Sequence, residues 1–285
     1  MGAGEGSSPH PAPTRWMSSE LGARVLSAIV LGLFALFALY RGGWVFALFW
    51  LAAGVATLIE WTDMTRVAPH RPLQAALAGA LVAMTGLYLA RVAFPVVLAV
   101  LGAALVLALV AARGSRSRLW AAAGFLYAAV LTLVPPVVRD DPGLGLVALL
   151  WMFAVVWATD IAAYFTGRRL GGPKLWPRVS PKKTWSGFGG GLAAGVLAGL
   201  AVALSAERLG WTPLFGWPAV AALSAAASVA SQIGDLGESA LKRGCDVKDS
   251  SHLIPGHGGV MDRVDGFWAV CALVGVALLI RPVAQ

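Results

Sequence analysis

Long apolar segments, separated by short polar or glycine- and proline-containing connections, follow one another along almost the whole chain. This pattern predicts nine membrane-spanning segments, near residues 25–40, 44–61, 73–92, 95–112, 119–138, 143–164, 187–204, 216–236 and 264–281. About 20 apolar residues let a helix cross a hydrocarbon core of roughly 30 Å. No stretch alternates between polar and apolar residues as the strands of a membrane β-barrel do. We therefore predict an all-α, polytopic integral membrane protein with about nine transmembrane helices.

The amino-acid composition excludes a soluble globular protein. Of the 285 residues, 58% are hydrophobic and 13% are charged, whereas an ordinary soluble domain carries roughly 25% charge. The formal net charge is +8, but the basic residues lie between the predicted spans. Lipid headgroups and phosphorylated substrates are nearer partners there than nucleic acid. Cys245 lies in a basic loop and Cys271 in an apolar segment, so both are predicted to be free thiols.

The N-terminal tail differs from the rest of the chain. Residues 1–22 are rich in glycine, serine and proline and contain no apolar stretch. They are predicted to form a disordered cytoplasmic tail rather than a cleavable signal peptide. Residues 23–285 are predicted to form a single membrane-embedded domain, with N-terminal spans in 23–138 and a half that carries the polar motifs in 143–285.

The distribution of basic residues predicts the orientation. With the N-terminus in the cytoplasm, five of the 22 Lys and Arg residues lie outside, namely Arg41, Arg91, Arg139, Arg208 and Arg281. Cytoplasmic loops usually carry the excess of Lys and Arg, so the count of nine spans and the orientation support each other. Two longer cytoplasmic segments, 165–186 and 237–263, then hold most residues suited to phosphate chemistry. The predicted location is a bacterial-type cell membrane, with the active site on the cytoplasmic side.

Two acidic clusters flank the second of these segments. Asp235 lies in the sequence DLGES at the end of the eighth span, and Asp262 in MDRVD at the start of the ninth. Mg²⁺ takes one or two carboxylates and fills its other sites with water and phosphate oxygens, so both aspartates are predicted as Mg²⁺ ligands. Ser239 lies one helical turn beyond Asp235. Its hydroxyl either assists the metal or a phosphate, or makes an ordinary helix hydrogen bond.

The basic residues of the same segment leave a second interpretation open. Carboxylates at a membrane boundary are paired, hydrated or bound to a cation, because desolvating them is costly. Salt bridges to nearby lysine or arginine would therefore also satisfy the two aspartates. In the catalytic interpretation, four basic residues are candidates for contact with a phosphorylated substrate: Lys242, Arg243, Lys248 and Arg263.

A glycine-rich sequence, PGHGG, precedes the ninth span at residues 255–259. Glycines allow backbone N–H groups to turn inward and approach an anion closely. Gly258 and Gly259 are therefore predicted either to contact a substrate phosphate or to form an ordinary tight turn before the helix. His257 either donates to that phosphate or caps the turn.

A second phosphate-binding segment is predicted at residues 180–187, in the sequence SPKKTWSG. It precedes a helix expected to begin near Gly187, and a helix start offers free N–H groups and a positive dipole end. The candidate substrate-binding residues are Ser180, Lys182, Lys183 and Thr184. Alternatively, the two lysines only anchor the seventh span at the cytoplasmic surface. Small residues that let another helix pack closely follow at four-residue spacing: Gly187, Gly191, Gly195 and Gly199.

Two acids lie within or at the end of apolar spans. Asp160 is expected about one turn from the cytoplasmic end of the sixth span. Ionisable groups inside a membrane are usually functional, so Asp160 is predicted to contact a bound nucleotide or one of the arginines that follow it. Glu60, in contrast, ends the second span and is expected to reach the interface without a partner.

The run from Ser239 to Asp265, SALKRGCDVKDSSHLIPGHGGVMDRVD, closely resembles the signature of phosphatidate cytidylyltransferases, also called CDP-diglyceride synthases. The stretch from Asp160 to Thr184 is similar to the same family, so the resemblance covers roughly the C-terminal half. The N-terminal spans match only as a hydropathy pattern. One departure is Ser186, where the family commonly has glutamate, and no role is assigned to it.

The resemblance implies Mg²⁺-dependent transfer of a cytidylyl group from CTP to phosphatidic acid, giving CDP-diacylglycerol and pyrophosphate. It also implies a fold of membrane helices and a homodimer in the bilayer. The family's metal-binding aspartates fall on Asp235 and Asp262, with Ser239 beside them.

Two alternatives remain at this point. One is a CTP-dependent enzyme acting on another membrane lipid, which as a lipid kinase would release CDP rather than pyrophosphate. The other is a transporter, which would place its charges near the bilayer midplane, whereas this chain collects them in the predicted cytoplasmic loops.

Overall fold

The computed structural model describes residues 29–212, 215–251, 253–254 and 258–280. Within these ranges a short apolar helix, Ile29–Arg41, comes first. The elements that follow are α2 (Gly43–Thr65), α3 (His70–Leu89), α4 (Phe94–Ala111), α5 (Ser115–Arg139), α6 (Gly145–Leu170), β1 (Lys174–Trp176), β2 (Ser180–Thr184), α7 (Trp185–Arg208), α8 (Trp217–Gly244) and α9 (Met261–Ile280). The eight helices α2 to α9 are long and apolar enough to cross a membrane. The chain is thus a multi-pass, mostly helical membrane protein.

The second to ninth predicted spans correspond one to one with α2 to α9. The main differences lie at the polar ends. The helix α6 continues to Leu170 and α8 to Gly244, so parts of the two segments predicted as loops are helical. The first predicted span begins outside the described residues, and its described part is the helix Ile29–Arg41. The tail predicted at 1–22 also lies outside the described residues.

A two-stranded antiparallel hairpin connects α6 to α7 and was not predicted. Strand β1 pairs with β2, Lys174 opposite Thr184 and Trp176 opposite Ser180. The chain leaves α6 through Gly171 and Gly172, whose φ values of 62° and 97° are readily accessible to glycine. At the other end, Thr184 caps α7, because its side-chain oxygen accepts a hydrogen bond from the Gly187 amide at 3.1 Å.

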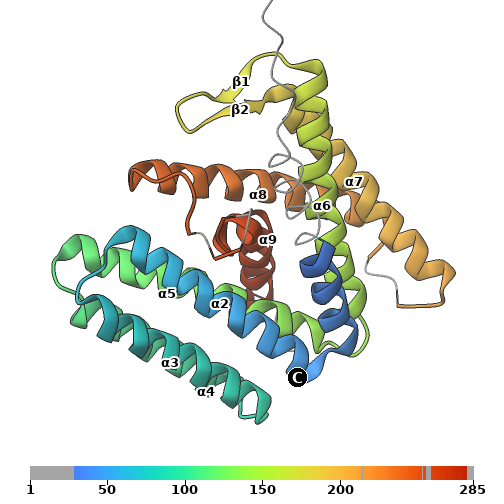
Figure 1. The fold of residues 1–285 in the computed structure, drawn as a ribbon. Coiled ribbons are helices and arrows are strands. Elements are labelled where there is room, and N and C mark those ends of the chain that lie inside the picture. The colour runs from blue at the N-terminus through green and yellow to red at the C-terminus, as the bar shows by residue number, and fades with distance from the viewer. Residues whose placement is uncertain (1–28, 213–214, 252, 255–257, 281–285) are drawn as a thin grey trace, which may run out of the picture.

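The helix α9 lies at the centre of the molecule, seen nearly end-on in Figure 1, with α2 to α5 on one side and α6 to α8 on the other. Aromatic contacts hold it against the N-terminal helices. The Trp50 and Phe267 rings stack with centroids 4.9 Å apart, and those of Tyr127 and Trp268 at 4.2 Å. Since α9 also packs against α8, it contacts both halves of the chain.

The small-residue stripe of α7 is confirmed as a packing surface, since Gly187, Gly191, Gly195 and Gly199 are all buried. A side chain at Gly195 would meet Ser228 of α8, with a Cβ–Cβ distance of 3.0 Å. Ser228 Oγ in turn accepts a hydrogen bond from Thr159 Oγ1 of α6 at 2.9 Å. The stripe thus brings α6, α7 and α8 into close contact, and these three helices form the wall of the site.

The described connections gather at two ends of the molecule, as expected for successive helices that run in opposite directions. At one end the Arg113 amide donates to the Ala68 carbonyl at 2.6 Å. At the opposite end Arg91 pairs with Asp140 at 2.7 Å, and Arg139 Nε donates to the Leu39 carbonyl at 2.8 Å.

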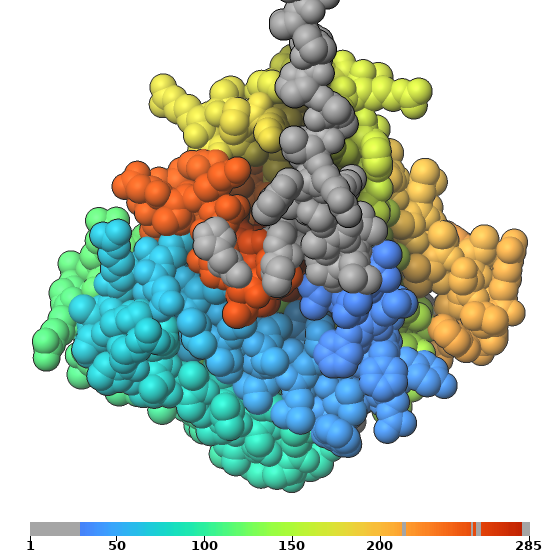
Figure 2. Space-filling view, viewed as in Figure 1, coloured from blue at the N-terminus to red at the C-terminus, as the bar shows by residue number. Residues whose placement is uncertain are grey.

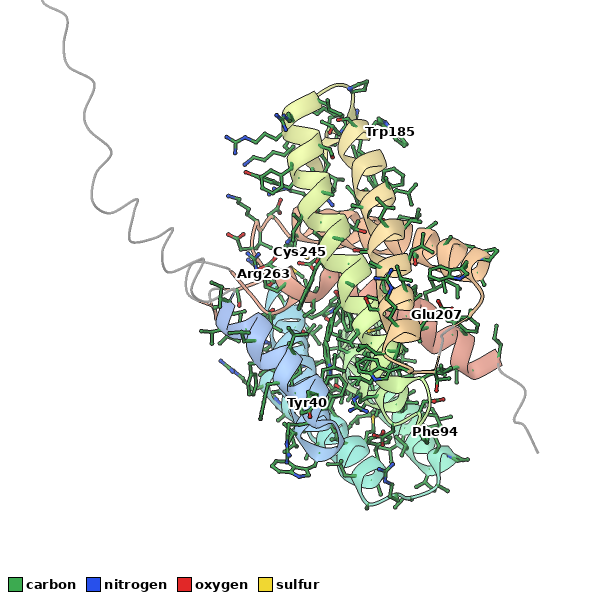
Figure 3. All side chains as sticks on the ribbon, turned by 90° about the vertical axis from the view of Figure 1, so that its right-hand side faces the viewer. Tyr40, Phe94, Trp185, Glu207, Cys245 and Arg263 are labelled. Carbon is green, nitrogen blue, oxygen red and sulfur yellow. The ribbon has the colours of Figure 1, made fainter. Side chains whose placement is uncertain are left out.

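The loop after α8 belongs to the first of these ends. Burial raises the pKa of the Cys245 thiol. The guanidinium groups of Arg116 and Arg66 are close enough to oppose this rise in pKa by their positive charge. In Figure 3, Trp185, Cys245 and Arg263 lie towards the top of the molecule, and Glu207, Tyr40 and Phe94 lie below them. The loops that connect α2 to α3, α4 to α5 and α8 to α9 therefore share one end of the molecule.

Candidate active site

A pocket of about 660 Å³ lies between α6, the hairpin, α7 and α8. Figure 2 shows the hairpin, in yellow, directly above the end of α8, in orange. We call this space the α6–α8 pocket. The charged side chains that line it are Asp160, Arg168, Lys174, Lys182, Lys183 and Asp235. Four cationic groups beside two carboxylates suit a substrate that carries several phosphates.

An ion pair joins the hairpin to α8 inside this pocket. Lys183 Nζ lies 2.5 Å from Asp235 Oδ2, and the two side chains are 26% and 36% exposed. Asp160 of α6 interacts electrostatically with both. Because α6 continues to Leu170, Asp160 lies ten residues before the helix end rather than one turn from it. The structure thus brings together Asp160, Lys182, Lys183 and Asp235, which were all predicted as site residues.

The hydroxyl residues of the hairpin face different surroundings. Thr184 lines the pocket but is buried, and its oxygen is used to cap α7. Ser180 lies in β2 opposite Trp176, at the far end of the strand from Thr184. Ser186 Oγ donates to the Gly171 carbonyl at 2.5 Å, so at this position a short hydroxyl closes the turn between α6 and the hairpin.

A second charged group, the Lys242 cluster, is formed by Glu238, Lys242 and Asp262. Lys242 Nζ lies 3.0 Å from Glu238 Oε1 and 2.5 Å from Asp262 Oδ1. The side chains are 1% exposed for Glu238, 13% for Lys242 and 8% for Asp262. This cluster ties the end of α8 to the start of α9.

The second oxygen of Asp262 is also occupied. It accepts hydrogen bonds from the Ser250 amide at 3.0 Å, from the Ser250 hydroxyl at 2.9 Å and from the Gly259 amide at 2.8 Å. Gly258 has a φ of 82°, and a Cβ on Gly259 would collide with Ser250 Oγ. The glycine sequence therefore lets the chain fold tightly over Asp262, and the Gly259 amide is directed at that carboxylate.

Glu60 requires a correction, because it does not reach the interface. The helix α2 continues to Thr65, and Glu60 is only 3% exposed. Its Oε1 accepts from Ser251 Oγ at 2.7 Å and from the Val260 amide at 2.8 Å. Its Oε2 accepts from Ser250 Oγ at 3.1 Å and from the Met261 amide at 2.8 Å. We call these five residues the Glu60 cluster.

The remaining predicted residues lie around the end of α8 and the loop that follows. Arg243, Lys248 and Arg263 are exposed, and Ser239 is half-buried. His257 lies outside the described residues. Asp265 of α9 was mentioned only as part of the family signature, yet it interacts electrostatically with Glu238, Asp235 and Asp160. It therefore lies near acids of both the α6–α8 pocket and the Lys242 cluster.

The carboxylates of this region are the candidate ligands for a metal ion. Among the residues that the structure describes, no three or more His, Cys, Asp or Glu side chains are arranged to hold a metal ion. Mg²⁺ does not need such a cage, because one or two carboxylates with water and phosphate oxygens suffice. Lys183 and Lys242 form ion pairs with three acids of this region, and Glu238 Oε2 is buried without a hydrogen-bond partner among the described residues. The three acids are thus already paired with lysine, and their oxygen ligands suit a hard divalent cation that also takes phosphate oxygens.

Comparison with known proteins identifies the class. The model of the family described as "Cytidylyltransferase family" matches residues 22–280, so the chain belongs to the cytidylyltransferase family. Phosphatidate cytidylyltransferases from Brucella suis and Brucella melitensis are each 46% identical over 261 residues, which cover 90% of this chain and 92% of theirs. The phosphatidate cytidylyltransferase of Haemophilus influenzae is 44% identical over 154 residues, 51% of this chain. The similarity to the Brucella enzymes thus extends well beyond the C-terminal half.

Proposed function

We propose that this chain is a phosphatidate cytidylyltransferase, which converts CTP and phosphatidic acid into CDP-diacylglycerol and pyrophosphate. The observation that carries this proposal is the 46% identity to phosphatidate cytidylyltransferases over 90% of the chain. The α6–α8 pocket supports it, because lysine and arginine side chains surround two carboxylates there.

The reaction we propose is an in-line displacement. A phosphate oxygen of phosphatidic acid attacks the α-phosphorus of CTP, and the bond from that phosphorus to the oxygen bridging to the β-phosphate breaks. The bonding electrons leave with pyrophosphate. Since the attacking oxygen is already anionic, the protein needs to align the two substrates and to stabilise charge rather than to form a covalent intermediate.

In this proposal, the basic residues of the α6–α8 pocket and those near the Lys242 cluster bind different substrates. Lys182 and Lys183 bind the lipid phosphate, and Arg168 and Lys174, which line the same pocket, add further cationic contacts. Four basic residues at the end of α8, in its loop and at the start of α9 bind the triphosphate: Lys242, Arg243, Lys248 and Arg263. Ser180, Thr184, Ser239, Gly258, Gly259 and His257 remain proposed substrate contacts, and Asp160 a proposed contact to the nucleotide.

Asp235 and Asp262 are the proposed ligands of Mg²⁺. When bound, the ion would neutralise charge on the phosphates of CTP. Asp235 presents a partly exposed carboxylate to the pocket, whereas Asp262 is held by Lys242, Ser250 and Gly259. Mn²⁺ binding measured by electron paramagnetic resonance on wild type, Asp235→Asn and Asp262→Asn tests this assignment independently of turnover. Unchanged binding in both variants would contradict it.

The decisive experiment supplies purified protein with CTP, phosphatidic acid and Mg²⁺ and measures pyrophosphate and CDP-diacylglycerol together. Equal amounts of both products are expected. Formation of CDP in place of pyrophosphate would indicate a lipid kinase instead. We further propose that the N-terminus and the site face the cytoplasm. We also propose that the protein is a homodimer, and light scattering of the protein in detergent can test this oligomeric state.

A further inference from the structure

We propose that Glu60 is a positioning residue, which fixes the segment 258–262 and thereby sets the location of Asp262. This inference rests on the proposed function for its catalytic consequence. Glu60 lies on α2, in the half of the chain that carries none of the signature residues. Its partners lie 190 to 201 positions away in the sequence.

The start of α9 shows why this carboxylate is needed. The first turn of a helix has N–H groups without an intrahelical partner, and a Ser, Thr, Asp or Asn at the N-cap usually accepts from them. The residues before α9 are Gly258, Gly259 and Val260, which offer no such side chain. Glu60 supplies the missing acceptor from another helix, since it receives the Val260 and Met261 amides. Its negative charge also suits the positive dipole end of α9.

The pattern of donors requires a carboxylate rather than an amide. Each oxygen of Glu60 accepts from one backbone amide and one serine hydroxyl. A glutamine in this place would direct its NH₂ group at one of the two amides, whichever way it turned. A hydroxyl can rotate to become an acceptor, but a backbone N–H cannot. One buried donor would remain unsatisfied, so the start of α9 would shift or open.

Ser250 connects Glu60 to Asp262 directly. Its hydroxyl, which has one hydrogen to share between the two carboxylates, lies 3.1 Å from Glu60 Oε2 and 2.9 Å from Asp262 Oδ2. A Cβ at Gly259 would lie 2.6 Å from Glu60 Oε2, so this turn fits over Glu60 only as glycine. Ser251, in contrast, contacts Glu60 but has no described bond to Asp262. A displacement of Glu60 is therefore transmitted to Asp262 through Ser250 and Gly259.

The first test compares Glu60→Gln, Glu60→Asp and the control Glu207→Gln. Glu207 is an exposed acid at the end of α7. Glu60→Gln is expected to lower kcat by about 10- to 100-fold, the range usual when a partner that orients an active-site ligand is lost. KM for phosphatidic acid should stay within about threefold, because its proposed contacts, Lys182 and Lys183, lie on the hairpin and not on segment 258–262. Glu60→Asp should recover part of the lost kcat, and Glu207→Gln should behave like wild type.

The second test separates positioning from general stability and remains usable if Glu60→Gln fails to fold. Ser250→Ala and Ser251→Ala each remove one hydroxyl bonded to Glu60, so a purely structural role predicts similar effects on kcat. The proposal predicts that Ser250→Ala lowers kcat several-fold more than Ser251→Ala, because only Ser250 also holds Asp262. Equal kcat values in the two variants, or a Glu60→Gln enzyme with wild-type kcat, would overturn it.

Hydrogen–deuterium exchange gives a readout that does not depend on activity. Peptides containing the Val260 and Met261 amides should exchange at least about tenfold faster in Glu60→Gln than in wild type, because one of those two amides loses its acceptor and the start of α9 opens. Unchanged exchange would refute the cap itself. If the wild-type protein makes no CDP-diacylglycerol but the exchange prediction holds, the proposed function has failed and the cap has not.

Discussion

At the scale of single residues, two aspartates with the same predicted role have different surroundings. Asp235 is 36% exposed and has one described ion-pair partner, Lys183. Asp262 is 8% exposed and has four described donors, Lys242 among them. An exposed ion pair stabilises a protein by about 0–1 kcal/mol, whereas a buried group left without its partner costs about 1–3 kcal/mol. Their substitutions should therefore be distinguishable by stability.

Asp235→Asn and Asp262→Asn should each lower the rate of pyrophosphate release by about 100-fold or more, because each removes one ligand charge proposed to hold Mg²⁺. Only Asp262→Asn should also lower the free energy of unfolding, by about 2 kcal/mol. Thermal unfolding in detergent, measured beside the rate assay, checks both statements. Equal midpoints for the two variants would contradict the structural role of Asp262. The double variant should be little slower than either single one, since residues that act as a unit are not additive.

The two lysine-bearing regions should divide between the substrates. Lys183 lines the α6–α8 pocket beside Asp235, and Lys248 is exposed in the loop after α8. Lys183→Ala is expected to raise KM for phosphatidic acid by about tenfold, and KM for CTP by less. Lys248→Ala is expected to raise KM for CTP more than KM for phosphatidic acid. Lys183→Arg should rescue only partly, because a planar guanidinium meets a phosphate with different geometry. Equal shifts of both constants would indicate one mixed phosphate site.

Candidate site residues could be predicted from the sequence where they lie close to one another along the chain. Asp235, Lys242 and Asp262 could be found because they belong to one polar run between two apolar spans. Glu60 could not, since its partners lie about 200 positions away and nothing local reveals them. The available signals were an acid within an apolar helix and a helix start without a capping side chain. Either alone is weak, and only the tertiary structure joins them.

At the scale of elements, hydropathy predicted the eight helices α2 to α9 but not their polar ends. The helix α6 extends past its apolar run through Arg168 and Arg169, which are favoured in a last turn because they interact with the negative end of the helix dipole. The hairpin was missed because its strands have only three and five residues and little apolar character. Short polar strands carry no periodic signal that a sequence pattern could reveal.

The glycine stripe of α7 can be tested with a matched pair in the same helix. A Cβ at Gly199 would collide with Ser224 Oγ and lie 2.8 Å from Trp151 Nε1, whereas a Cβ at Gly189 meets nothing within 4 Å. Gly199→Ala should therefore destabilise the protein by about 1–3 kcal/mol through overpacking. Gly189→Ala should be neutral or stabilise it by up to about 1 kcal/mol, because alanine favours the helix. Similar unfolding midpoints for both would refute close packing of α7 at Gly199.

At the scale of the whole molecule, the grouping of loops at two ends predicts which positions share a side of the membrane. In a background without Cys245 and Cys271, cysteines at Ser115 and Asp246 should react with an impermeant maleimide from the cytoplasmic face. A cysteine at Asp141 should react from the opposite face only. Labelling of Asp246 and Asp141 positions from one face would contradict the nine-span arrangement. Labelling of all three with the faces exchanged would leave the fold intact and reverse the orientation.

The long sequence separation between Glu60 and the start of α9 has a consequence for how the protein is made. Ribosomes add about 5–20 residues per second, so the 200 positions between Glu60 and Val260 take about 10 to 40 s to synthesise. During that time α2 has left the ribosome, and its acid has none of the partners it has in the finished protein. Until α9 is made, the Glu60 carboxylate must therefore be hydrated, protonated or bound by the insertion machinery, because it lies beside the lipid.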